Sequence, residues 1–79
     1  ATSALKGELT DTEKRIALLE VKQKENELIL CEPEIYRDPG RIRLLNQELR
    51  TISTELEDLY YAWNDLTVKI EALEESLRC

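Results

Sequence analysis

Histidine, methionine and phenylalanine are absent from this sequence of 79 residues, and glycine, proline and cysteine occur only twice each. Without histidine, the chain lacks the usual general base near neutral pH. It also lacks a glycine-rich phosphate loop and a nucleophile with a neighbouring base. Cys31 and Cys79 have no metal-site spacing, and we interpret them as ordinary reduced thiols. We therefore expect no catalysis, no metal site, no cofactor bound by this segment and no small-molecule substrate.

Long apolar runs are absent as well. The longest uninterrupted run covers residues 28–31, whereas a membrane-spanning helix needs roughly 20 apolar residues. No charged start leads into an apolar stretch, so we expect no signal peptide. These absences predict a soluble, cytoplasmic protein with no membrane partner. Because the chain begins with Ala1 rather than methionine, we interpret it as a domain cut from a longer protein or as a processed chain.

The residues that are abundant are those of long amphipathic helices. Apolar residues make up 42% of the chain and charged residues 35%, which is typical of such helices. One interruption organises the chain, because Pro33 and Pro39 cannot lie inside a helix. Asp38 followed by Pro39 is a helix-start signal, with Asp38 as the N-cap. The sequence thus predicts one domain with a helix over about residues 3–30, a turn over 31–38 and a helix over about 39–77.

A coiled-coil seam runs along both expected helices. In the second helix the apolar residues recur at alternating steps of three and four, at Ile42, Leu45, Leu49, Ile52, Leu56, Leu59, Trp63, Leu66, Ile70, Leu73 and Leu77. The first helix repeats this spacing at Leu5, Leu9, Thr12, Ile16, Leu19, Gln23, Asn26 and Leu30, where three positions are polar. Such steps define the a and d positions of a coiled coil. We predict an all-α fold, a two-helix antiparallel coiled-coil hairpin.

The layers of this hairpin follow from matching a positions with d positions. A register in which Leu19 faces Leu56 satisfies the match at every layer, and it places Trp63 opposite the small Thr12. We therefore expect Trp63 to pack in the core. The same register brings Lys22 beside Glu55. This opposite-charge pair supports the register, although an exposed pair adds little to the stability of the fold.

Two polar residues interrupt the seam near the turn. Gln23 and Asn26 would face Ile52 and Leu49. A buried amide without a partner costs roughly 1–3 kcal/mol. We expect both amides to reach solvent at the edge of the narrow seam. The alternative interpretation is a loosened tip that flexes on binding.

Arginines concentrate around the turn, at Arg37, Arg41, Arg43 and Arg50. The guanidinium group is suited to phosphate contact, and the neighbouring Tyr36 adds an aromatic surface. These five residues are the candidate contact site for nucleic acid. The alternative interpretation is a set of solvated charges, balanced by the acidic residues of the same stretch, Glu32, Glu34, Asp38 and Glu48.

Three segments together resemble a known family. The turn Pro33-Glu-Ile-Tyr36, the following Asp38-Pro39 and the segment Leu59-Tyr-Tyr-Ala-Trp63-Asn-Asp-Leu66 are similar to the C-terminal coiled-coil domain of ABC-F ATPases, the Uup-like proteins. The resemblance covers roughly residues 10–70. It implies a parent with two ATP-binding cassettes, which use ATP and magnesium and act in translation on the ribosome. It also implies nucleic-acid binding, since this domain is implicated in it in some members.

Two hypotheses for function follow. The first is a non-catalytic coiled-coil arm of an ABC-F type ATPase that contacts ribosomal RNA, DNA or the ribosome through its arginine-bearing tip. The second is a structural or protein-interaction coiled coil without nucleic-acid binding, which would use the acidic face of the second helix or the end with Leu73 and Leu77. Those two leucines have no partners in the first helix in this register. The sequence leaves the oligomeric state open between a monomer and a weak dimer.

Overall fold

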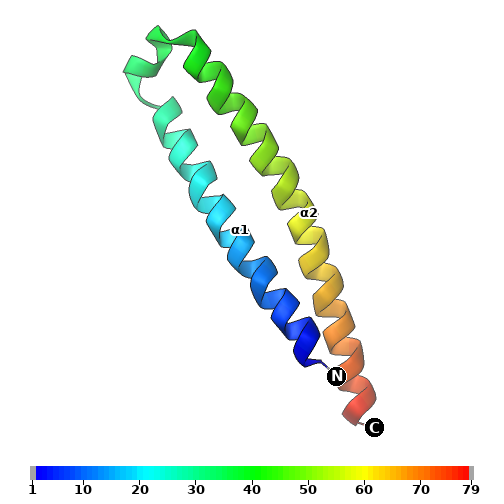
Figure 1. Ribbon diagram of the computed structural model, residues 1–79. Coiled ribbons are helices and arrows are strands. Elements are labelled where there is room, and N and C mark those ends of the chain that lie inside the picture. The colour runs from blue at the N-terminus through cyan, green and yellow to red at the C-terminus, as the bar shows by residue number, and fades with distance from the viewer. Residues whose placement is uncertain (1, 79) are drawn as a thin grey trace.

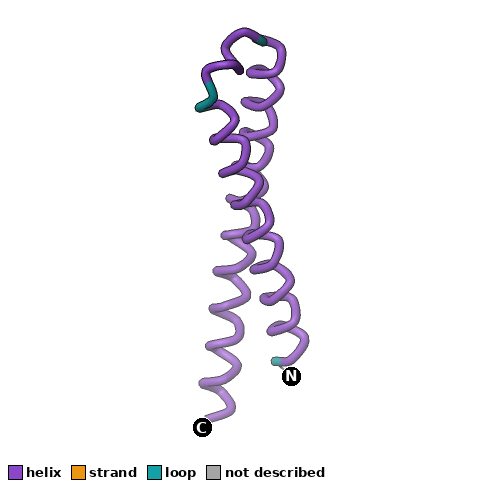
Figure 2. Tube along the Cα trace, turned by 90° about the vertical axis from the view of Figure 1, so that its left-hand side faces the viewer, coloured by secondary structure: helices purple, strands orange, loops and turns teal. Residues whose placement is uncertain are grey.

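Two long helices, α1 (Ser3–Leu30) and α2 (Pro39–Arg78), form a computed structural model that describes residues 2–78. They lie antiparallel and side by side in a rod of 64 × 15 × 15 Å (Figure 1). The view turned by 90° shows the same pair crossing at a shallow angle, with α2 reaching beyond the start of α1 (Figure 2). The predicted all-α helical hairpin is confirmed.

The turn contains a short 3₁₀-helix, η1 (Pro33–Arg37), which the sequence pattern did not predict. Pro33 occupies its first position, where a missing N–H leaves no donor unsatisfied. The N–H of Ile35 donates to the carbonyl of Glu32 at 3.2 Å, and the N–H of Asp38 donates to the carbonyl of Ile35 at 3.0 Å. Ile35 is buried, so this compact turn closes the top of the seam with an apolar side chain.

Asp38 begins α2 as the sequence predicts. Its Oδ1 accepts the backbone N–H of Arg41 at 3.2 Å, and its carbonyl accepts the N–H of Ile42 at 3.2 Å. Pro39 follows as the first helical residue. An aspartate cap of this kind stabilises a helix by about 0.5–2 kcal/mol, so the direction of α2 away from the turn is set locally.

The core is a narrow seam centred on Leu19, Ile52 and Leu56, with Ile16 and Leu59 packed against it. This cluster contains the predicted Leu19–Leu56 layer and the layer next to it. All eight predicted seam positions of α1 are buried or half-buried. A pair of helices buries only one stripe of each, and this explains why no large side chain in the described residues is fully enclosed.

Contacts on the two edges of the seam agree with this register. On one edge Arg15 Nη2 lies 3.0 Å from Glu55 Oε1, and on the other Lys6 Nζ lies 3.1 Å from Glu74 Oε1. The expected partner of Glu55 was Lys22, and that expectation is wrong. Exposed ion pairs differ in energy by less than about 1 kcal/mol, so a small advantage in geometry decides which pair forms. The guanidinium group of Arg15 contacts both carboxylate oxygens of Glu55, at 3.0 and 3.2 Å, and it therefore replaces the ammonium group of Lys22, one heptad away.

Asn26 is buried, contrary to the expectation that it reaches solvent. Its Nδ2 has no hydrogen-bond partner among the described residues, and Asn26 occupies a d position, which points into the seam. Gln23, one turn earlier, is half-buried. An unsatisfied amide N–H of this kind costs about 1–3 kcal/mol, so the seam is weakest close to the turn.

The end of α2 beyond the start of α1 carries two exposed leucines. Leu73 is 38% exposed and Leu77 is 75% exposed, in keeping with the prediction that they have no partners in α1. Over the described residues, neither helix has a stretch long and apolar enough to cross a membrane.

Candidate functional site

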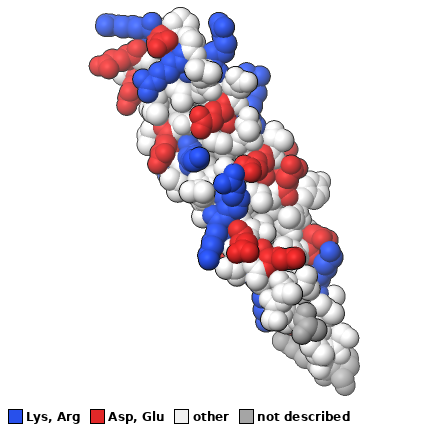
Figure 3. Space-filling model, in the orientation of Figure 1, with Lys and Arg blue, Asp and Glu red and all other residues white. Residues whose placement is uncertain are grey.

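The tip of the hairpin carries the predicted contact residues on two elements. Arg37 ends η1, and the other three arginines, Arg41, Arg43 and Arg50, lie in the first turns of α2. All four are exposed, and none forms an ion pair within residues 2–78. Tyr36 is 69% exposed beside them. Basic side chains project from this end in several directions and alternate with acidic ones (Figure 3).

The four guanidinium groups do not converge on one pocket. Arg43 and Arg50 are one heptad apart and share a face, separated by about 10 Å along the helix axis. Arg41 and Arg43 are two residues apart, which turns them about 200° from each other around the axis. This arrangement is suited to several separate phosphate contacts and gives no enclosed anion site.

Charge differs between segments of the sequence. Residues 31–50 contain four basic and four acidic residues, whereas residues 51–79 contain two basic and seven acidic ones. The segment over residues 31–50 is therefore neutral, while the acidic excess lies on the C-terminal part of α2. The three ion pairs among the described residues involve Lys6, Arg15 and Lys69, and none includes one of the four arginines.

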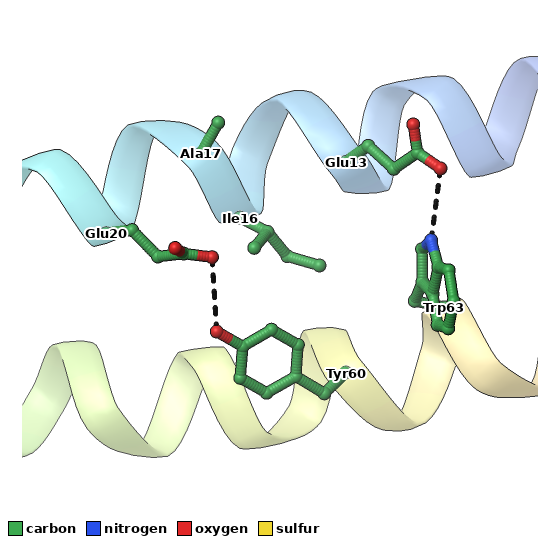
Figure 4. A pocket seen from close by; sticks show the side chains of 6 residues that line it. All are labelled: Glu13, Ile16, Ala17, Glu20, Tyr60 and Trp63. Atoms are coloured by element: carbon green, nitrogen blue, oxygen red, sulfur yellow. Dashed lines mark hydrogen bonds between the residues drawn. The ribbon is translucent and has the colours of Figure 1, made fainter.

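A groove of about 380 Å³ lies on one edge of the seam, halfway along the rod (Figure 4). Its lining residues are Glu13, Ile16, Ala17, Glu20, Tyr60 and Trp63. The first four come from α1 and the two aromatic residues from α2 (Figure 4). No sequence pattern indicates this groove, because it forms only where the edges of the two helices meet.

Trp63 borders the groove and does not pack in the core as predicted. It is 38% exposed, and its indole N–H donates to Oε1 of Glu13 at 3.0 Å (Figure 4). One layer of a two-helix seam is too narrow to enclose an indole, and a buried indole N–H needs an acceptor. The side chain therefore leans out of the seam toward the carboxylate on the opposite helix.

Tyr60 forms the second aromatic wall. Its hydroxyl donates to Oε1 of Glu20 at 3.2 Å, again from α2 to α1. Desolvation raises the pKa of Tyr60 above its usual 10.0, and the hydrogen bond to Glu20 and the negative charge of Glu20 raise the pKa further. The phenol therefore stays protonated and keeps donating at neutral pH. A tyrosine one position after a seam residue was the only sequence signal for this contact.

A second hollow of about 470 Å³ continues the groove toward the tip. It shares Ala17, Glu20 and Tyr60 with the first hollow. Its other lining residues are Val21, Gln23, Lys24 and Glu27. The two hollows together form one elongated furrow along the edge of the hairpin, which we call the edge groove.

Comparison with protein families decides what kind of domain this is. The sequence model of the ABC transporter C-terminal domain matches residues 1–68. The chain belongs to this family. As an ABC transporter C-terminal domain it is an accessory part of an ABC protein, distinct from the module that hydrolyses ATP.

One curated relative of this C-terminal domain is the "Putative ATP-binding protein YdiF" of Bacillus subtilis (strain 168). The two are 26% identical over 57 residues, which is 72% of this chain and 9% of the relative. The chain thus spans about a tenth of the length of the relative it matches. No solved structure matches it.

Proposed function

We propose that this domain is a non-catalytic coiled-coil arm of an ABC-F type ATP-binding protein and contacts nucleic acid through its tip. The contact residues are Arg37, Arg41, Arg43, Arg50 and Tyr36. The supporting observation is that four exposed arginines, none of which forms an ion pair within residues 2–78, lie on η1 and the first third of α2. The nucleic acid is ribosomal RNA or DNA, and the ribosome is the setting that the ABC-F resemblance implies.

The charge of the sequence segments supports contact by the turn and the start of α2 in preference to contact by the rest of α2. A chain with a net charge of −6 is repelled by polyphosphate as a whole. Repulsion is smaller at the turn and the start of α2 than along the rest of α2, because residues 31–50 hold as many basic as acidic residues and salt screens charges more than about 10 Å away. The acidic remainder of α2 would then point away from the phosphates.

Nucleotide chemistry has no place in this proposal for the hairpin itself. A P-loop binds ATP through a glycine-rich turn whose N–H groups surround the phosphates. Gly7 lies inside α1, and Gly40 lies in the first turn of α2, so these residues do not fit a phosphate loop. We assign ATP and magnesium to the cassettes of the parent protein.

The test is a salt titration of binding to a short fluorescent duplex DNA and to a ribosomal RNA fragment, followed by anisotropy. The tip variant replaces Arg37, Arg41 and Arg43 with alanine. The matched control replaces Lys14, Lys22 and Lys24 with alanine, which removes the same charge from α1. We expect binding to weaken steeply with salt, and the tip variant to reduce both the affinity and the salt slope.

An equal loss of affinity in the two variants would mean that binding depends on overall charge only, and it would overturn the assignment of the contact to the tip. Absence of binding at low salt would leave the second candidate, a protein-interaction coiled coil. The observation that favours it is the apolar end of α2, where Leu73 and Leu77 are exposed. In that case Leu77→Lys should abolish association with the partner surface, while the tip variant should leave it unchanged.

A further inference from the structure

We propose that the edge groove docks a basic amphipathic helix of a protein partner. The lysine or arginine side chains of this helix would lie over Tyr60 and Trp63 and bind the carboxylates of Glu13, Glu20 and Glu27. This surface lies on the side of the rod, apart from the arginine-bearing tip. It is acidic, whereas the proposed contact residues of the tip are basic. The inference therefore does not depend on nucleic-acid binding.

The aromatic residues supply a platform for a cation. Tyr60 is 47% exposed and Trp63 is 38% exposed, and both line the same hollow (Figure 4). The two rings are held in place by hydrogen bonds across the seam, at 3.2 and 3.0 Å. Cations bind to the faces of tryptophan and tyrosine rings, and arginine does so most often. Ordered rings lower the entropic cost of such a contact.

The carboxylates supply the matching charge. Each of the two aromatic hydrogen bonds uses only Oε1, of Glu13 and of Glu20. No hydrogen bond or ion pair of the described residues uses the other oxygen of either group, and a guanidinium group would find a strong, charge-assisted acceptor there. The one basic residue that lines the edge groove is Lys24, against three carboxylates. A phosphate-bearing partner would be repelled here.

The spacing of the carboxylates selects a helix as the occupant. Glu13, Glu20 and Glu27 are seven residues apart on α1, so their backbones are about 10 Å apart along the axis. A second helix laid beside α1 presents side chains at the same interval when its basic residues are also seven apart. A single small cation would occupy one of these positions only.

Small and apolar residues between the carboxylates allow close packing. Ala17 is shared by both hollows and Val21, which lines the second, is 55% exposed. A small side chain lets the backbone of a partner helix approach, and the exposed valine offers an apolar contact next to it. The hairpin and the incoming helix would together form a three-helix arrangement along this edge.

The experiment uses the fluorescence of Trp63, which is the sole tryptophan of the chain. The probe is a helix-forming peptide of roughly three heptads with arginine at seven-residue intervals. One control peptide has glutamine in place of arginine. A second control keeps the arginines but spaces them five residues apart. We expect a saturable change in emission with the first peptide, at least tenfold weaker binding of the off-register peptide and none with the neutral one.

Matched variants separate the groove from net charge. Glu13→Gln combined with Glu20→Gln should weaken binding of the arginine peptide at least tenfold, while circular dichroism shows the hairpin still folded. Glu57→Gln combined with Glu71→Gln removes the same charge from residues that do not line the groove, and it should leave binding within a factor of two.

Two outcomes would overturn the proposal. Equal binding of the two arginine peptides, or equal losses in the two double variants, would mean attraction to the overall negative charge only. Self-association of the hairpin without peptide, seen by sedimentation and abolished by Glu13→Gln with Glu20→Gln, would assign the edge groove to a second copy of this chain in place of a partner protein.

Discussion

The indole N–H of Trp63 donates to Oε1 of Glu13 at 3.0 Å, from the middle of α2 to the facing edge of α1. This bond joins a seam position to a position that flanks the seam on the other helix. It holds the indole outside the core, and it thereby creates one wall of the edge groove. Its energetic contribution can be measured directly.

Glu13→Ala removes the acceptor of this bond. We expect the free energy of unfolding to fall by about 0.5–1.5 kcal/mol, toward the lower end because Trp63 is partly exposed. The emission of Trp63 should also shift, since its N–H is left to water. Urea unfolding followed by tryptophan fluorescence measures both effects. Glu57→Ala, on the exposed outer face of α2, serves as the control. An equal loss of stability in this variant would show that the hydrogen bond to Trp63 does not contribute.

Asn26→Leu should stabilise the hairpin. The substitution removes a buried amide nitrogen that lacks a partner and replaces it with an apolar side chain of similar size in the seam. We expect the free energy of unfolding to rise by about 1–3 kcal/mol. Gln23→Leu is the comparison, and because Gln23 is only half-buried its gain should be smaller. Thermal and urea unfolding provide the measurement. A lower Tm for Asn26→Leu would contradict the view that the buried amide destabilises the seam.

Alkaline titration should single out Tyr60. Its pKa lies above the usual 10.0, first because of desolvation and then because of Glu20. The folded state holds this proton more tightly than the unfolded state does. The resulting stabilisation is therefore complete below about pH 10 and is lost as the pH rises through the pKa of the folded state.

Glu20→Gln tests the cause of this shift. It removes the negative charge, so the phenolate absorbance of Tyr60 should appear at lower pH than in the parent chain, with Tyr60→Phe used to identify its signal. An unchanged titration in Glu20→Gln would leave desolvation as the sole cause. A titration of Tyr60 at or below its usual pKa in the parent chain would contradict the geometry of the hydrogen bond.

Asp38→Ala should weaken the start of α2. The side chain accepts the N–H of Arg41 at 3.2 Å, and loss of such a cap costs about 0.5–2 kcal/mol. Hydrogen exchange should become faster at the first amides of α2 than in the rest of that helix. Asp11→Ala is the control, because no hydrogen bond or ion pair of the described residues uses the Asp11 side chain. Uniformly faster exchange along α2 would argue against a local capping role.

Much of this fold could be predicted from local chemistry. Pro33 and Pro39 exclude a continuous helix, Asp38 supplies the cap, and the alternation of three and four fixes the buried stripe of each helix. The register also followed from the pattern, because matching a with d positions leaves few alternatives. Leu19 and Leu56 meet in the core cluster for this reason.

The sequence predicted where the turn and the arginine-bearing tip lie in the chain. It did not predict the geometry within the turn. A short 3₁₀-helix that buries Ile35 and exposes Tyr36 depends on hydrogen bonds between residues of the turn itself. A segment this short is too small to show a periodic sequence pattern from which such hydrogen bonds could be predicted.

The sequence by itself determined the two helices, their turn and the seam, because these depend on backbone sterics and on a repeat that both helices share. Tertiary structure alone decided that Trp63 leaves the core and that Asn26 Nδ2 is buried without a hydrogen-bond partner among the described residues. It also decided which of several nearly equivalent ion pairs forms. These outcomes depend on the width of a two-helix layer and on differences of about 1 kcal/mol between exposed contacts, which exist only once both helices are in place.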